Sequence, residues 1–136
     1  MIERGGTVRA EVITDIKRST LHHRVRKSIE AGSTVYTDAL ASYSGLDADY
    51  AHETVDHAEA YVDGRVHTNG MENFWSLLKR GLHGTYISVE PFHLFRYLDE
   101  RCFTFNQRDL DDRGRFEAVL IGAARRKLTY AELTGR

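Results

Sequence analysis

The sequence contains little cysteine and little proline, and this excludes several classes of protein. Cys102 is the only cysteine among 136 residues, so an internal disulfide and a cysteine-rich zinc site are both impossible. The single proline, Pro91, and the lack of low-complexity segments leave no linker between domains. We therefore expect one globular domain, with Cys102 as a buried structural thiol.

The sequence also lacks a long apolar segment and a dominant charge. No stretch reaches the roughly 20 apolar residues of a membrane span, and the charged N-terminus has no signal-peptide core, so a cytoplasmic protein is expected. Lys and Arg number 19 against 20 Asp and Glu, which gives a formal net charge of −1. Any binding of nucleic acid must then depend on local patches.

The N-terminal part of the chain predicts a strand, a helix and a second strand, an order typical of α/β proteins. Alternating apolar residues indicate the first strand, and the Gly5-Gly6 pair before it indicates a hairpin turn. The expected elements are a strand over residues 7–14, a helix from a cap at Ser19 or Thr20 to about Glu30, and a buried strand over residues 33–37.

The rest of the chain predicts mainly helices, because apolar residues recur there at helical spacing. Residues 39–66 are irregular, with possible short strands at residues 53–55 and 61–62. The expected helices cover residues 70–82, 91–107 and 115–128, followed by a helical turn over residues 130–133. The side chains expected to face inward are Met71, Phe74, Trp75, Leu78, Phe116, Val119, Leu120 and Ala123.

An acidic residue ends the second predicted strand. Asp38 directly follows residues 33–37, and in α/β sheets the carboxyl ends of the strands line the crevice where ligands bind. The residues alone leave a second interpretation open, in which Asp38 caps the short helix that follows it.

A second acidic residue and a lysine lie on the predicted helix over residues 70–82. Glu72 and Lys79 are seven positions apart, so they share one helix face. Asn69 and Glu72 also have the spacing of a capping box, an alternative compatible with a functional role. Two carboxylates such as Asp38 and Glu72 are suitable ligands for Mg²⁺, and a lysine suits a phosphate oxygen.

Two segments are specific enough to indicate a family. YTDALASY at residues 36–43 and HTNGMENFWSLLKR at residues 67–80 lie in this order between ERGGTVRAEVI at residues 3–13 and HLFRYLDERCFTFNQRD at residues 93–109. Together they resemble the ISXO-like branch of the DDE insertion-sequence transposases. The resemblance covers about residues 2–109 and implies a ribonuclease H-like fold with metal-dependent DNA strand cleavage and transfer.

The resemblance assigns roles to individual residues. It implies that Asp38 and Glu72 are the second and third catalytic acids and that they hold Mg²⁺, for which Mn²⁺ can substitute. Lys79 corresponds to the downstream basic residue of the family. Asn69 and His67 are secondary candidates for the same site.

The resemblance also implies contacts with DNA. Lys79, Arg80 and Arg108 are the candidate DNA-binding residues, and Asn106 with Arg108 matches an Asn-x-Arg pattern whose role we interpret as structural or backbone-binding. The implied partners are transposon-end and target DNA, with a homo-oligomer or an intact transposase as possible protein partners.

The chain departs from the family pattern at its start. Members carry the first catalytic Asp on a strand upstream of the segment that opens this chain, and Asp15 matches a position outside the catalytic set. We therefore expect a truncated α/β or α+β ribonuclease H-like core without its first strand. Residues 1–109 would form the partial catalytic domain and residues 110–136 a helical extension of it. The alternatives are an inactive remnant that at most binds DNA or intact transposase, and an unrelated α+β binding module.

Other polar groups give weaker signals. His52, Asp56 and His57 form a small cluster, for which a solvated loop is favoured over a metal site. Basic residues surround the first predicted helix, where an exposed charged face is at least as well supported as a DNA contact. These basic residues are Lys17, Arg18, Arg24, Arg26 and Lys27.

Overall fold

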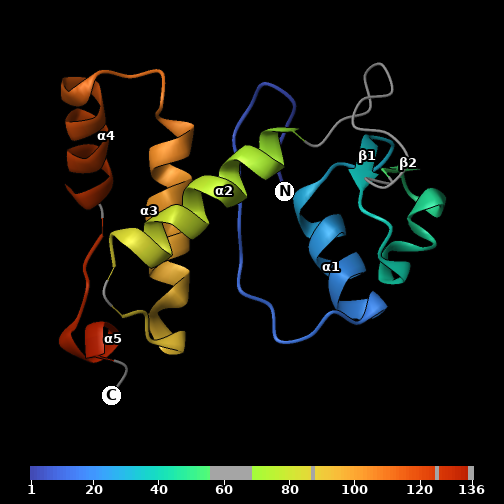
Figure 1. Cartoon of the computed structure of the whole chain (residues 1–136), viewed down its shortest axis with the longest axis horizontal. Coiled ribbons are helices and arrows are strands. Elements are labelled where there is room, and N and C mark those ends of the chain that lie inside the picture. The colour runs from blue at the N-terminus through green and yellow to red at the C-terminus, as the bar shows by residue number, and fades with distance from the viewer. Residues whose placement is uncertain (56–68, 87, 125, 135–136) are drawn as a thin grey trace. The chain divides into compact units, whose positions relative to one another are not determined.

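The computed structural model describes residues 1–55, 69–86, 88–124 and 126–134 (Figure 1). The chain divides into two compact units. The sheet unit comprises Ile13–Asn69, and the helical unit comprises Met1–Val12 with Gly70–Arg136. Several helices and one small sheet make the fold α+β.

The sheet unit is built around a parallel pair of strands. Its elements are α1 (Arg18–Ser28), β1 (Thr34–Thr37), the 3₁₀ turns η1 (Ala41–Tyr43) and η2 (Leu46–Ala48), and β2 (Ala51–Thr54). Thr34 lies opposite Ala51 and Thr37 opposite Thr54, so both strands end at the same edge. Gly45 has a φ of 90° between η1 and η2, a conformation that glycine adopts without steric cost.

One cluster of buried side chains forms the core of the sheet unit. Val25 from α1, Val35 from β1, Leu46 from η2 and Tyr50 pack together. The hydroxyl of Tyr50 donates a hydrogen bond of 3.1 Å to the carbonyl oxygen of Ile29, so the polar end of this buried ring has a partner. Complete burial of one such apolar side chain contributes about 1.5–3 kcal/mol.

The helical unit consists of helices and an N-terminal hairpin. Its helices are α2 (Asn69–Gly84), the 3₁₀ turn η3 (Pro91–His93), α3 (Leu94–Asn106), α4 (Asp112–Ala124) and α5 (Tyr130–Thr134). The predicted helices over residues 70–82 and 91–107 are therefore confirmed, the second with a 3₁₀ first turn that begins at Pro91. The predicted helical turn at residues 130–133 is present as α5.

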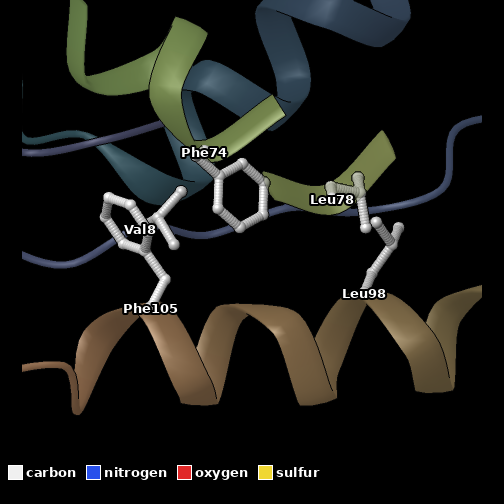
Figure 2. Close-up of a cluster of buried hydrophobic side chains, with 5 residues drawn as sticks. All are labelled: Val8, Phe74, Leu78, Leu98 and Phe105. Atoms are coloured by element: carbon white, nitrogen blue, oxygen red, sulfur yellow. The ribbon is translucent and has the colours of Figure 1, made fainter. Parts of the chain in front are cut away.

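The core of the helical unit lies between α2 and α3. Phe74 and Leu78 on α2 face Leu98 and Phe105 on α3, and Val8 packs against them (Figure 2). The rings of Phe74 and Phe105 meet edge to face, with centroids 5.5 Å apart. Such aromatic pairs contribute beyond the area that they bury.

The strand predicted over residues 7–14 is mostly absent. Only Val8 makes a bridge, antiparallel to Ile2, and the main-chain groups of Thr7 and Arg9 bond back to residues 1–3. The predicted turn is present, because Glu3 accepts a hydrogen bond from Gly6. The strand does not continue because Val12 is 47% exposed instead of facing a core. The described parallel pair is consequently β1 with β2, and the predicted crossover through the first helix is wrong.

Two helix starts differ from the prediction, and an aspartate lies shortly before each of them. α1 begins at Arg18, before the expected caps Ser19 and Thr20, and Asp15 accepts the N–H of Lys17. α4 begins at Asp112, where Oδ1 of Asp111 accepts the N–H of Gly114 at 2.8 Å. The bond in α4 reaches an N–H group of the first turn and so stabilises the helix start, whereas α1 has no side-chain cap hydrogen bond.

Several side chains predicted to face inward are exposed. Trp75 is 41% exposed, and Phe116, Val119 and Leu120 on α4 are 62%, 50% and 51% exposed. Helical spacing identifies an apolar face but cannot supply a partner for that face. Cys102 is only half-buried against the core of the helical unit, and burial raises the pKa of its thiol.

Candidate functional site

Asp38 lies in a hollow at the carboxyl edge of the two strands. It directly follows the last residue of β1, its side chain is exposed, and Thr54 at the end of β2 lines the same hollow. Oδ1 of Asp38 accepts a hydrogen bond of 3.3 Å from the N–H of Leu40. This bond has the geometry of a local turn, and η1 begins at Ala41 without a side-chain cap. The position at the strand edge agrees with the prediction.

The surroundings of Tyr43, which include the charge of Asp38, raise the pKa of its phenol. The phenol of Tyr43 lines the same hollow, and its pKa is raised first by burial and then by the negative charge of Asp38. An anionic tyrosine beside a carboxylate is unfavourable, so the ring stays a neutral donor at physiological pH. The hollow thus contains one carboxylate with a neutral hydroxyl nearby.

A histidine connects this hollow to the end of β1. Nε2 of His52 lies 2.8 Å from Oγ1 of Thr37, and Nδ1 lies 3.2 Å from Oδ1 of Asp47. The side chain of His52 is 7% exposed, whereas that of Asp47 is 74% exposed. The sequence pattern does not indicate this arrangement, because it favours a short strand at residues 53–55. With β2 at Ala51–Thr54, His52 and Thr54 share one strand face.

The second group of candidate residues lies on α2. Glu72 and Lys79 are both exposed, and together with Trp75 and Ser76 they line one shallow depression. Their spacing places them on one helix face, as predicted. Glu72 lies in the first turn, where the helix dipole favours a negative charge. This face therefore combines a carboxylate, a hydroxyl and an ammonium group along an open surface.

Asn106 and Arg108 have structural roles in the helical unit. Oδ1 of Asn106 accepts the N–H of Val8 at 2.7 Å, and Nδ2 donates to the carbonyl oxygen of Val8 at 3.0 Å. Nη1 of Arg108 donates to the carbonyl oxygen of Phe105 at 2.9 Å, and the guanidinium lies 4.7 Å from the centre of that ring. These bonds agree with the structural interpretation of the Asn-x-Arg pattern, and its backbone-binding alternative stays a prediction.

The remaining predicted site residues stay predictions. Arg80 is exposed on α2 beside Lys79. His67 lies outside the described residues, as do Asp56 and His57, and only the main chain of Asn69 is described, at the start of α2. Asp38 belongs to the sheet unit and Glu72 to the helical unit, so their joint use also stays a prediction.

The donor chemistry fits a hard divalent cation. Carboxylate oxygens are the ligands that Mg²⁺ prefers, and Asp38 and Glu72 are exposed carboxylates. Within the described ranges, no three histidine, cysteine or acidic side chains gather in a way that would hold a metal ion. Nor does any helix in the described parts combine the length and the apolarity of a membrane span.

The comparison with known proteins identifies the family. The family described as "ISXO2-like transposase domain" matches residues 1–106. An "Uncharacterized transposase-like protein" of Haemophilus influenzae is 29% identical over 100 residues, which is 73% of this chain and 80% of the relative. No solved structure matches. Since the family match spans well over half of the 136 residues, the chain belongs to the family of ISXO2-like transposase domains.

Proposed function

We propose that this chain acts in DNA transposition as a DDE-type domain with a ribonuclease H-like core, cleaving and joining DNA strands with the help of a divalent metal. The observation that carries the proposal is the family match, because residues 1–106 include Asp38, Glu72 and Lys79. The transposase-like relative supports the same function.

Asp38 and Glu72 are the proposed ligands of Mg²⁺, with Mn²⁺ as a substitute. The support is separate for each residue: Asp38 lies at a strand edge where α/β sheets bind ligands, and Glu72 is exposed in the first turn of α2. When bound, such an ion supplies Lewis-acid stabilisation of the charge that develops on a phosphoryl oxygen. His67 and Asn69 remain secondary candidates for this site.

The proposed DNA contacts are three cationic side chains of the helical unit, Lys79, Arg80 and Arg108. Lys79 lines the same depression as Glu72, and its ammonium suits a non-bridging phosphate oxygen. Arg80 adds a second exposed cation on α2. Arg108 is the weakest of the three candidates, because its guanidinium already bonds to the main chain at the end of α3.

The test measures DNA nicking and metal binding on the same preparations. The purified chain is incubated with supercoiled plasmid and Mg²⁺ or Mn²⁺, and Mn²⁺ affinity is measured by titration. Asp38→Asn and Glu72→Gln should each weaken Mn²⁺ binding and abolish any nicking. Asp109→Asn, which removes an exposed carboxylate outside the candidate site, is the matched control.

The outcomes separate the possible functions. If Asp38→Asn and Glu72→Gln bind Mn²⁺ as tightly as Asp109→Asn, the metal role of these residues is wrong. If the chain binds Mn²⁺ and DNA but does not nick, it is a DNA-binding module whose chemistry needs further residues.

A further inference from the structure

A chain of hydrogen bonds leads from solvent to the main chain of Asp38. Nδ1 of His52 contacts Oδ1 of Asp47 at 3.2 Å, and Nε2 contacts Oγ1 of Thr37 at 2.8 Å. The hydroxyl of Thr37 also lies 3.0 Å from the carbonyl oxygen of Asp38. The imidazole is almost completely buried while Asp47 is largely exposed, so the ring is held between a solvated carboxylate and the strand end.

The number of protons on these groups restricts which hydrogen bonds they can form together. A carboxylate only accepts hydrogen bonds, so Nδ1 of His52 must carry a proton to bond to Asp47. Thr37 has a single hydroxyl proton, which goes either to the Asp38 carbonyl or to Nε2 of His52. If Nε2 carries a proton, it donates to Oγ1 of Thr37, and the hydroxyl proton goes to the Asp38 carbonyl. If Nε2 carries none, it accepts the hydroxyl proton, and the main chain of Asp38 loses this restraint.

We infer that His52 is a positioning residue for Asp38, acting through the hydroxyl of Thr37, with Asp47 fixing the orientation of the ring. The two partners of the ring come from different elements, Asp47 from η2 and Thr37 from β1. Asp38, directly after β1, and Tyr43 of η1 line the same hollow as His52. The inference deepens the proposed function, since its effect on metal binding rests on the proposed role of Asp38.

The first experiment observes the ring directly. Nitrogen-15 chemical shifts of the folded chain distinguish a protonated from an unprotonated imidazole nitrogen at His52. We expect Nδ1 to carry a proton that it donates to Asp47, and Nε2 to carry one that it donates to Oγ1 of Thr37, because only then is the hydroxyl proton left for the Asp38 carbonyl. An Nδ1 or an Nε2 without a proton in the unmodified chain would overturn the inference.

The second experiment observes the restraint on Asp38. The carbonyl carbon-13 shift of Asp38 should change in His52→Gln and in Thr37→Val, and Thr37→Ser should restore it because serine retains the hydroxyl. His23→Gln, on the exposed side of α1, is the histidine control and should leave the shift unchanged. An unchanged shift in both Thr37→Val and His52→Gln contradicts the inference even if the variants are folded.

Mn²⁺ titration then separates this inference from the proposed function. If both are right, Asp38→Asn abolishes the binding at this site, and His52→Gln weakens it by about 10-fold, the lower end of the effect of losing a group that orients a ligand. If only Asp38→Asn changes the affinity, the positioning role is wrong and the proposed function stands. If Asp38→Asn has no effect, the metal role fails, and the chemical shifts alone decide whether His52 restrains Asp38.

Discussion

At the scale of single residues, the carboxamide of Asn106 forms the two hydrogen bonds with Val8 that a neighbouring strand would otherwise form. Thr7 and Arg9 bond to residues 1–3, so the main-chain groups of Val8 point the opposite way. Asn106 satisfies both of these groups with one acceptor and one donor. Val8 can therefore be 1% exposed without a second strand beside it, since buried main-chain groups require partners.

Asn106→Ala should destabilise the helical unit substantially. The substitution leaves the N–H and the carbonyl of Val8 unpaired, and each unsatisfied buried group costs about 1–3 kcal/mol. We expect the free energy of unfolding in urea to fall by roughly 2–4 kcal/mol, allowing for partial access of water. Asn73→Ala on the exposed face of α2 should change it by less than about 0.5 kcal/mol. Equal effects of the two substitutions would contradict this role.

Asp15 gives the start of α1 a dependence on pH. Hydrogen bonds from the Thr20 side chain and the N–H of Lys17 lower the pKa of the Asp15 carboxyl below its ordinary value of 3.8. Because folding lowers this pKa, the ionised group favours the folded state above pH 3.8, and that contribution is lost as the pH falls through the folded value. Thr20→Val should raise the pKa of Asp15 in an NMR titration, whereas Ser19→Ala should not.

At the scale of helices and strands, the sequence predicted the elements whose apolar residues form a strong local repeat. α2 and α3 were predicted closely because a strong apolar repeat forms each inward face. The apolar residues of α4 have the same spacing, but packing partners come from elsewhere in the fold, and Phe116 is 62% exposed. β2 was shifted in the prediction because four residues carry little pattern of their own and depend on pairing with β1.

Alanine substitutions on the two faces of α2 should lower the free energy of unfolding by very different amounts. Phe74 is 1% exposed in the core, while its neighbour Trp75 is 41% exposed and contacts Phe74 edge to face. We expect Phe74→Ala to lower the free energy of unfolding by about 3–5 kcal/mol, and Trp75→Ala by about 1 kcal/mol or less. Denaturant unfolding of both variants measures the difference. A larger loss for Trp75→Ala would mean that α2 packs by the other face.

At the scale of the whole molecule, the sequence predicted the candidate residues but not the side chains that contact them. Asp38, Glu72 and Lys79 could be named from two sequence segments, because those residues lie inside the motifs that carry the family resemblance. The support for Asp38 by Thr37, His52 and Asp47 could not be foreseen, since it depends on the register that places two parallel strands side by side. Local motifs thus indicate the candidate residues, and tertiary pairing determines which side chains lie beside them.

The near-neutral charge of the chain makes its proposed DNA binding depend on a few cations. With a net charge of −1, the molecule has no general attraction for DNA, and each phosphate contact must come from a local group. The slope of log affinity against log salt concentration is negative, and each lost phosphate contact reduces its magnitude by about 0.9. We expect Lys79→Gln to weaken binding to duplex DNA and to reduce the magnitude of this slope by about 0.9, the value for one phosphate contact. Lys127→Gln, which removes an exposed lysine outside the candidate site, should leave the slope unchanged. Identical slopes for the unmodified chain and Lys79→Gln would mean that the depression on α2 does not face DNA.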